Sequence, residues 1–362
     1  MRQGAQYATA LMVRGFFAKG YEVDLLLSEF HFESSRQGKV PFEVPAGVNI
    51  VRLPHVKARG NIGALRRYLR RTNAVAVVAM SQNYTWCLRL ASIGLLHCPK
   101  LVHVEHGLAG LDDGVARGSV GTFTKRGMAT RFLYHGYDRV LTVSAKGKDE
   151  FIRYYSFYPH DSVHIVYNPV VDEVFYAKRK CQAVHPWLLN KECPTFVSAG
   201  AYQEYKGHHD LIEAMRLLQG RLACRVVVFG SGPLNDAYNK LIEDHQLQEC
   251  INFAGYTDNL PAELSHADGF VLSSIEESFG IVLVEALACG CPVLSTDAPF
   301  GPREILNNGE YGMLVPVHDP AALAAGLEKL ARGEIAKAPD ASWQRFTLEA
   351  AVERYEQGIG LK

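Results

Sequence analysis

Two patterns of apolar residues alternate along the chain. Short runs rich in β-branched residues are typical of buried strands, and longer stretches with an apolar residue every three or four positions are typical of amphipathic helices. Their alternation indicates parallel sheets covered by helices. In the first half of the chain, strands are predicted at residues 21–27, 48–53, 74–80, 100–106, 139–144 and 163–168. Helices are expected between several of these strands, among them residues 64–71 and 145–155.

The same alternation restarts in the second half, after a polar segment rich in Lys and Arg at residues 173–187. Here the predicted strands are residues 195–200, 225–230, 251–255, 269–274 and 292–297. The predicted helices are residues 208–220, 281–290 and 342–360.

This order of elements predicts an α/β fold with two Rossmann-like, doubly wound domains. The first domain is expected at residues 1–172 and the second at residues 195–341, with a linker at 173–194 between them. The C-terminal helix, within residues 342–362, is expected to cross back onto the first domain.

The start of the chain departs from this pattern. A doubly wound domain normally opens with a strand whose carboxyl end carries a glycine loop, but here the loop at residues 3–6, with Gly4, comes almost at once. A helix is predicted directly after it, at residues 7–20. The missing strand would lie in the middle of the sheet, where its absence leaves two neighbours with unpaired backbone groups. Either the natural protein starts earlier, or the first domain is compromised.

Composition narrows the class of protein. With 362 residues, 48% hydrophobic and 21% charged, the chain fits a soluble protein with more than one core. Lys+Arg and Asp+Glu both number 38, which argues against a dedicated nucleic-acid binder but not against a local basic patch. No apolar run approaches the ~20 residues of a membrane helix, and the N-terminus lacks the pattern of a signal peptide. The expected location is therefore the cytoplasm, with peripheral contact at the inner face of the membrane as a second expectation.

The eight cysteines are scattered without a repeating framework, which is typical of free thiols in a reducing compartment. Cys289 and Cys291 are spaced too closely for a usual zinc site, and no second pair lies nearby in the sequence. No metal is expected.

The most informative segment is residues 273–297, in which a predicted strand is followed by a turn and a helix. The N–H groups at the start of that helix form an anion site, which Gly280 would let a phosphate approach closely. Glu285 interrupts an apolar helix, and the two hydroxyls of a ribose would be suitable partners for its carboxylate. The spacing of Glu277 and Glu285 does not by itself require a ligand. It is explained equally well if Glu285 is a partly exposed helix residue and Glu277 is an acid near the helix dipole.

The residues around Glu277 and Glu285 favour a ligand-binding role for these two acids over a structural one. Phe279-Gly280 follows Glu277 closely, and the pattern E-A-L-A-x-G-x-P-V begins at Glu285. Together they closely resemble the donor-site signature of glycosyltransferase family 4, the retaining enzymes of GT-B fold, in which two Rossmann-like domains face each other across a cleft. The resemblance extends over residues 226–234, 253–274 and 298–324, and more weakly over 100–107, 140–151 and 165–171.

The resemblance implies roles for individual residues. Glu277 would bind hydroxyls of the donor sugar, and Glu285 would bind the ribose of the nucleotide. Lys206 would neutralise the diphosphate, so that neither a metal nor another cofactor is needed. The alternative interpretation of Lys206 is a solvated lysine before a helix, without a role in binding. The turn that receives the diphosphate would consist of Ser278, Phe279, Gly280 and Ile281.

In the first domain, His106 matches the cleft-facing histidine of the family, which would bond the donor sugar; a structural hydrogen-bonding role is the alternative. Gly4 would line the loop over the phosphates if the domain is intact. One departure lies in the second domain, where the family usually has an arginine after the glycine of the preceding strand. Here Gly200 is followed by Ala201. Arg303 is a candidate to supply the missing phosphate contact.

Basic residues interleaved with aromatic ones also occur in the first domain. They could meet an anionic acceptor such as a lipid diphosphate or a lipopolysaccharide core, although a solvated helix face explains them as well. These residues are Arg66, Arg67, Arg70 and Arg71, then Lys125, Arg126 and Arg131 near Phe123 and Phe132.

The sequence therefore predicts a retaining glycosyltransferase that moves a hexose or N-acetylhexosamine from a nucleotide sugar, UDP-sugar favoured over GDP-sugar, to a glycan or glycolipid. Its expected role is the synthesis of cell-surface polysaccharide or lipopolysaccharide. Three alternatives stay open: a same-fold nucleotide-sugar enzyme such as an epimerase, a dinucleotide-dependent oxidoreductase, and an inactive sugar-nucleotide binder. The oxidoreductase is disfavoured because no complete G-x-G-x-x-G loop follows a predicted strand. The inactive binder is made plausible by Ala201 and the absent first strand.

Overall fold

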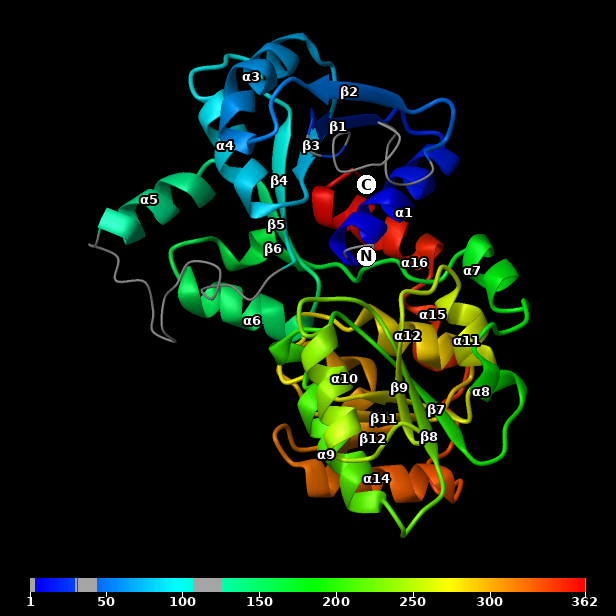
Figure 1. Cartoon of the computed structure of the whole chain (residues 1–362). Helices are drawn as coiled ribbons and strands as arrows, with labels where there is room; N and C mark the ends of the chain where they lie inside the picture. Colours follow the sequence, from blue (N-terminus) through cyan, green and yellow to red (C-terminus); the bar gives the residue numbers. More distant parts are fainter. Residues whose placement is uncertain (1–3, 30, 32–43, 107–124, 362) are drawn as a thin grey trace. The chain divides into compact units, whose positions relative to one another are not determined.

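The computed structural model describes residues 4–29, 31, 44–106 and 125–361 (Figure 1). The chain divides into two compact units. The first domain combines Arg2–Pro169 with Leu348–Lys362, and the second domain is Val170–Thr347. Among the described helices, none is both long and apolar enough to cross a membrane.

The second domain contains a six-stranded parallel sheet with the order β12-β11-β10-β7-β8-β9. From β7 the chain moves outward through β8 to β9, then returns to the other side of β7 and continues outward. This is the doubly wound order, and it reverses between β7 and β10. The strands are β7 (Thr195–Ala199), β8 (Arg225–Phe229), β9 (Ile251–Gly255), β10 (Gly269–Leu272), β11 (Val293–Thr296) and β12 (Met313–Val315).

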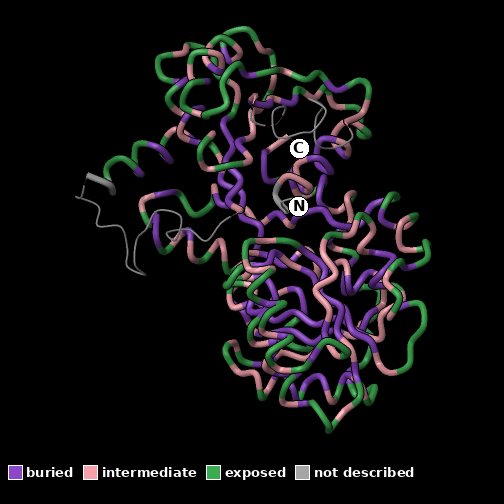
Figure 2. The backbone as a smooth tube through the Cα atoms, in the orientation of Figure 1, coloured by how far each residue is buried: buried purple, intermediate pink, exposed green. Residues whose placement is uncertain are grey.

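Helices cover the sheet because each presents one apolar face to it. In α9 the buried residues Leu211, Met215 and Leu218 recur at helical spacing and share a core with Leu323 and Leu327 of α14. Figure 2 shows that the buried parts of the backbone follow the strands of this domain. Its main helices are α9 (His208–Leu218), α10 (Asn235–Asp244), α11 (Leu260–His266), α12 (Ile281–Ala288), α13 (Gly301–Ile305) and α14 (Pro320–Ala331).

The segment 173–194, which we expected to be a linker, is instead packed into the second domain. It contains the short helices α7 (Glu173–Lys178) and α8 (Pro186–Leu189). The buried carboxylate of Glu263 accepts hydrogen bonds from the backbone N–H groups of Val184, at 3.1 Å, and His185, at 3.3 Å. Because a buried charge needs such partners, this carboxylate holds the segment in place.

The first domain has two parallel sheets, one with β1 and β2 and the other with the order β3-β4-β5-β6. A doubly wound order would place a further strand between β1 and β3, and among the described residues nothing pairs with both. The strands are β1 (Asp24–Ser28), β2 (Asn49–Leu53), β3 (Ala76–Ala79), β4 (Lys100–Glu105), β5 (Arg139–Thr142) and β6 (Val163–Ile165).

The two sheets share one hydrophobic core. Leu53 of β2 packs in the same cluster as Leu65 and Leu69 of α3 and Leu101 of β4. The first domain's helices before its last strand are α1 (Gly4–Ala18), α3 (Ile62–Arg71), α4 (Gln82–Ser92), α5 (Lys125–Tyr134) and α6 (Ala145–Tyr154).

The helix predicted over residues 342–360 is two helices. The shorter, α15 (Ala341–Gln344), belongs to the second domain, and α16 (Leu348–Ile359) belongs to the first. Between them Phe346 is fully buried, and its carbonyl accepts a hydrogen bond from the N–H of Val170 at 2.9 Å. The N–H groups of Phe346 and Thr347 bond to carbonyls three residues back, so the helical pattern is interrupted there.

In the first domain, α16 packs against α1. A side chain at Gly15 would collide with Val352, because its Cβ would lie 2.4 Å from the Val352 Cγ2. Lys19 and Tyr21 both bond the buried carboxylate of Glu356, at 3.0 and 2.9 Å. Glycine at the crossing and charge pairing at one end therefore fix α16 on α1.

Candidate functional site

The strand order of the second domain locates a ligand site before any side chain is considered. Ligands of open doubly wound sheets bind beyond the carboxyl ends of the strands, where the order reverses. That point lies between β7 and β10, which are hydrogen-bonded neighbours. The chain leaves β7 toward Lys206 and leaves β10 toward Glu277, so both predicted site residues lie on loops at this point.

The structure brings these two side chains into contact. The Lys206 Nζ lies 2.5 Å from the Glu277 Oε2, and the side chains are only 14% and 11% exposed. The hydroxyl of Ser274 donates a second hydrogen bond to the same carboxylate oxygen, at 3.3 Å. An ion pair that is largely removed from water needs such additional hydrogen bonds to offset the loss of hydration.

Backbone contacts fix the loop of Lys206 against the end of β10. The carbonyl of Tyr205 accepts hydrogen bonds from the N–H groups of Ile275, at 2.8 Å, and Glu276, at 3.2 Å. Gly207 has a φ of 62°, and a Cβ there would lie 2.0 Å from the Ser273 carbonyl oxygen. Only glycine combines that backbone conformation with so close an approach, so the position of Lys206 depends on it.

The turn at the start of α12 leaves an anion site open. Gly280 is its N-cap residue, with a φ of 97°, and among the described residues no side chain is recorded as a cap of the first N–H groups of the helix. Phe279 is buried, and its ring stands edge-on to Phe346 at 5.6 Å between centroids. A Cβ on Gly301 would lie 1.5 Å from the Phe279 carbonyl oxygen, so the turn is also held from the far side. Uncapped N–H groups and the dipole of α12 favour a negative group at this point.

Backbone strain accompanies the turn. Phe300 has a φ of 80°, unusual for a residue with a side chain, and it forms an isolated parallel bridge with Glu277. Such strain persists only where the surrounding structure imposes it, and it is concentrated at functional sites.

Glu285 lies on the more open face of α12. It is half-buried, as are Ile281 and Val282, whereas Leu283 and Val284 are buried. Glu285 follows Ile281 by four residues, which places it on the same face and about 6 Å further along the helix axis. The start of α12 therefore follows Glu277 closely in the chain and precedes Glu285 by about one helical turn.

Arg303 is the residue that we expected to replace the arginine absent at position 201. It lies on α13, where it forms a two-pronged ion pair with Asp297, and its side chain is 54% exposed. Ala201 itself is buried, and its carbonyl accepts a hydrogen bond from the Nε2 of His208 at 3.1 Å.

Sequence reasoning did not identify His208. Its side chain is buried among Tyr202, Tyr238 and Phe253, whose rings surround it at 5.6 to 5.7 Å. Burial lowers the pKa of His208 to about 4, with Lys206 contributing in the same direction and the bond to Ala201 opposing it. The imidazole is therefore neutral at pH 7 and supports the loop that carries Lys206. The aromatic residues around it are brought together only by the fold, so the sequence carries no local signal for His208.

His106 belongs to the first domain, directly after β4. Its Nε2 is buried and has no hydrogen-bond partner among the described residues. Burial lowers the pKa of His106 to about 4, although Glu105 opposes the shift. A neutral imidazole with one unsatisfied nitrogen is suited to bond a hydroxyl group of a ligand. Gly4 is the first residue of α1 and so part of a helix, not of the glycine loop that we expected.

The basic residues of the first domain do not act as one group. Arg66 donates to the carbonyls of Ala91, at 3.0 Å, and Ile93, at 2.6 Å, and so joins α3 to the end of α4. Arg131 lies over the ring of Phe157. Phe123 and the side chains of Lys125 and Arg126 lie outside the described part of the chain.

Among the described residues, no three His, Cys, Asp or Glu side chains are grouped as metal ligands. The thiols of Cys289 and Cys291 donate to the carbonyls of Pro261 and Leu264. Burial raises the pKa of Cys289 to about 12, so this thiol stays protonated at pH 7.

Each half of the chain matches a family model of glycosyltransferases. The family model described as "Glycosyltransferase Family 4" matches residues 2–174, and the model described as "Glycosyl transferases group 1" matches residues 183–342.

Among curated proteins, the chain is 25% identical over 204 residues to N-acetyl-alpha-D-glucosaminyl L-malate synthase of Bacillus anthracis, covering 55% of this chain and 53% of that protein. It is 34% identical over 139 residues to the lipopolysaccharide core biosynthesis glycosyltransferase LpsE of Rhizobium meliloti, covering 38% of this chain and 40% of that protein. The chain thus spans about half, or less, of the length of these relatives.

Solved structures show the same fold over the whole chain. A glycosyltransferase from Rickettsia africae aligns with a TM-score of 0.77 at 17% identity, covering 100% of this chain and 96% of that one. Anabaena Alr3699/HepE in complex with UDP and glucose aligns with a TM-score of 0.74 at 18% identity, covering 100% and 97%.

Proposed function

This chain belongs to glycosyltransferase family 4 and has the GT-B fold, and on that premise we propose that it transfers a sugar from a nucleotide sugar to a hydroxyl group of a cell-surface glycan or glycolipid. The observation that carries the proposal is the arrangement at the start of α12. Lys206 pairs with Glu277 on the turn before this helix, the N-cap residue Gly280 has no side chain to cap the helix, and Glu285 follows on the helix itself. A nucleotide sugar has the matching order, because its diphosphate separates the hydroxyls of the donor sugar from those of the ribose.

Without a ligand, Lys206 is held by Glu277. On donor binding, the diphosphate would take Lys206, and the freed carboxylate of Glu277 would accept hydrogen bonds from the donor sugar. The lysine would then stabilise the negative charge that grows on the departing diphosphate, a task for which a metal ion is not needed. Glu285, further along α12, would bind the ribose.

We infer that the reaction retains the anomeric configuration and that the departing phosphate accepts the proton of the attacking hydroxyl on the same face. His106, with its neutral ring and unsatisfied Nε2, would bond a hydroxyl of the donor sugar. A UDP-linked hexose or N-acetylhexosamine is the favoured donor, because the fold is shared with Anabaena Alr3699/HepE in complex with UDP and glucose. Lipopolysaccharide is a favoured acceptor, because the similar LpsE of Rhizobium meliloti is a lipopolysaccharide core glycosyltransferase.

A thermal-shift screen of UDP- and GDP-sugars tests the proposal, with Glu285→Gln as the diagnostic variant. The control is Glu243→Gln, which alters an exposed carboxylate on α10. We expect one UDP-sugar to stabilise the parent and Glu243→Gln equally, and Glu285→Gln much less. The donor proposal fails if no nucleotide sugar stabilises the protein, or if Glu285→Gln responds like the parent.

Turnover is then measured as UDP release from that donor with candidate glycan acceptors. Transfer of the sugar supports the proposal. Binding without any release would identify an inactive sugar-nucleotide binder, the alternative that Ala201 favours.

A further inference from the structure

The charges of the chain are unevenly distributed. Lys+Arg and Asp+Glu balance over the whole sequence, yet residues 44–104 contain nine Lys and Arg and no Asp or Glu. This segment includes β2, α3 and α4 of the first domain. A run of one sign over so many residues produces a positive potential that attracts anionic partners.

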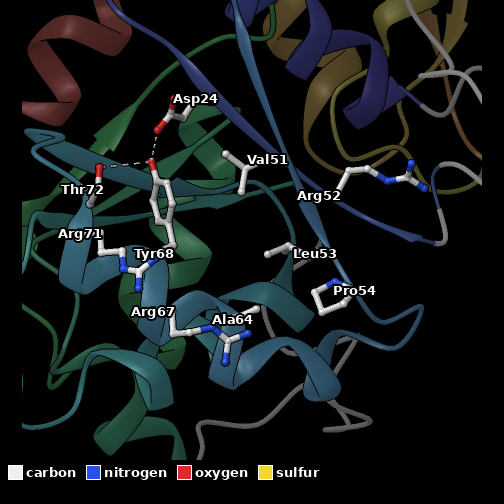
Figure 3. Close-up of a pocket in the computed structure, with 10 residues that line it drawn as sticks. All are labelled: Asp24, Val51, Arg52, Leu53, Pro54, Ala64, Arg67, Tyr68, Arg71 and Thr72. Atoms are coloured by element: carbon white, nitrogen blue, oxygen red, sulfur yellow. Dashed lines mark hydrogen bonds between the residues drawn. The ribbon is translucent and has the colours of Figure 1, made fainter.

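A pocket of about 550 Å³ lies between β2 and α3, and nine of its ten lining residues belong to this segment, the tenth being Asp24 of β1 (Figure 3). On the helix side it is lined by Ala64, Arg67, Tyr68 and Arg71, which recur at the spacing of one helix face. Leu65 and Leu69 point instead into the core, at 3% and 2% exposure. The strand side consists of the β2 residues and the turn after them, from Val51 to Pro54.

Two guanidinium groups of the pocket lack a countercharge. Arg67 and Arg71 are exposed, and neither has a carboxylate within ion-pair distance among the described residues. Arg52, on the other side, pairs with Glu29 at 2.9 Å. Like charges four residues apart on a helix repel each other, and an anion bound between them would remove that repulsion.

The pocket also contains a fixed aromatic ring. The hydroxyl of Tyr68 donates to the carboxylate of Asp24 at 2.7 Å, and Asn49 donates to the same carboxylate at 2.8 Å. Burial raises the pKa of Tyr68 to about 12, so the hydroxyl remains a donor. Asp24 is thereby engaged by two donors, and the ring of Tyr68 stands beside the apolar side chains of Val51 and Leu53 (Figure 3).

We propose that this pocket binds an anionic sugar unit of the acceptor chain, one that carries a carboxylate or a phosphate. Guanidinium groups bind both of these anions through paired hydrogen bonds. The apolar strand residues and the Tyr68 ring provide the surface that a carbon skeleton requires, as in most small-molecule sites. The inference rests on the proposed function, since a transferase that extends a glycan must hold the chain it extends.

The pocket fits a glycan better than a membrane surface. A helix that binds a bilayer places large apolar residues on its lipid-facing side. In α3, Leu65 and Leu69 are buried in the core and Ile62 is half-buried against it. The exposed residues of this helix include Arg67, Arg70 and Arg71. The site is also concave, as a chain ligand requires.

Direct binding tests the inference without the need for turnover. The probe is fluorescein-labelled hexagalacturonate, and its anisotropy is followed with the full chain at physiological salt. The diagnostic variant is Arg67→Gln/Arg71→Gln. The matched control is Arg59→Gln/Arg70→Gln, which removes the same charge from exposed positions of the same segment that do not line the pocket.

We expect the pocket variant to weaken binding at least about tenfold, with an effect of less than about threefold in the control. Excess maltohexaose, which is neutral, should not displace the probe. The inference is overturned if both variants weaken binding equally, if neither does, or if vesicles with anionic lipid bind the protein while the probe does not. The thermal shift with the UDP-sugar is recorded on the same samples, so that a failure of the donor site is recognised separately.

Discussion

The two basic sites of this protein are built in opposite ways. In the second domain, Lys206 is largely buried, paired with Glu277, and fixed by backbone contacts at the switch point of a continuous sheet. In the first domain, Arg67 and Arg71 are exposed beside a sheet that is divided between β1 and β3. The first arrangement suits one ligand in one geometry, and the second suits a charged chain held by shape and potential. Single changes should therefore have large effects at the buried site and graded effects at the open one.

The largest effect is expected from Lys206→Met. Loss of a preorganised charge at the reacting group lowers turnover by about 10²- to 10³-fold, which UDP release would measure. Lys240→Met, which removes an exposed lysine on α10, is the control and should act like the parent. Equal turnover in the two variants would remove Lys206 from the chemistry.

Lys206→Met should also lower the thermal midpoint of the ligand-free protein. It leaves the carboxylate of Glu277 without its cation, and breaking a buried pair in this way typically costs about 3 kcal/mol. The double variant Lys206→Met/Glu277→Gln should regain most of that loss, because the buried charge is gone. If the double variant shows no recovery, the unpaired carboxylate of Glu277 is not the cause of the lost stability.

The next effect concerns pH and His208. Its pKa in the folded protein, about 4, lies below the ordinary value of 6.5. Between these two values the unfolded chain takes up a proton that the folded domain does not, so stability falls as pH falls. His208 contributes at most about 1.4 kcal/mol per pH unit to this slope, and His106, whose pKa is also lowered to about 4, contributes in the same direction.

Thermal midpoints measured from pH 7.5 to 5 would show this loss. His208→Gln, which can still donate to the Ala201 carbonyl, should flatten the dependence. His209→Gln changes the neighbouring imidazole, which is 71% exposed, and is the control. If both variants keep the slope of the parent, another group causes it.

A smaller effect is expected from alanine at Gly280, and comparison with alanine at Gly290 distinguishes the cost of backbone strain from the loss of a contact at the site. Gly280 and Gly290 both have positive φ, 97° and 74°, so alanine at either position costs about 1–2 kcal/mol. A Cβ at Gly280 would contact Leu283 and Glu277, whereas nothing lies within 4 Å at Gly290. Both alanine variants should lose stability, but only Gly280→Ala should lose donor affinity in calorimetric titration. Equal loss of affinity in both would argue against a role for the turn.

The smallest effect has the opposite sign. Because Arg67 and Arg71 repel each other, Arg67→Gln/Arg71→Gln should keep or slightly raise the free energy of unfolding, by about 0.2–0.5 kcal/mol, as measured by chemical denaturation. A marked loss of stability would show that these arginines hold the fold, and the contrast between the two sites would then be lost.

The strands could be predicted from the sequence because parallel strands are buried on both faces and therefore form continuous apolar runs. Residues 251–255 coincide with β9, and the strand predicted at 100–106 ends one residue beyond β4. Segments fixed by single long-range contacts could not be predicted in this way. The buried Glu263 bonds the backbone of Val184 and His185, and the Phe346 carbonyl bonds Val170 between two helices, but neither contact has a local signature.

The same distinction holds in the candidate site, where residues with a local sequence signal could be predicted and residues placed by long-range contacts could not. Gly280 before a helix is a local signal of an anion site, and it was found as such. Lys206 and Glu277 are 71 residues apart, and their pairing was suggested by the family resemblance, not by periodicity. His208 was missed because its environment is assembled from three other elements. Arg67 and Arg71, in contrast, are four residues apart and therefore share one face of the helix, as Arg66 and Arg70 share another. This division could be predicted from the sequence.

The exposed arginines of α3 and of the turn before it have a practical consequence. Since the whole chain is neutral, with an isoelectric point of about 7.2, the residues outside 44–104 must carry an equal excess of acid. The chain therefore combines a basic segment with an acidic remainder even though its net charge vanishes. We expect it to be retained by cation- and anion-exchange resins alike near neutral pH and to elute at low salt from both, behaviour that its isoelectric point alone would not suggest.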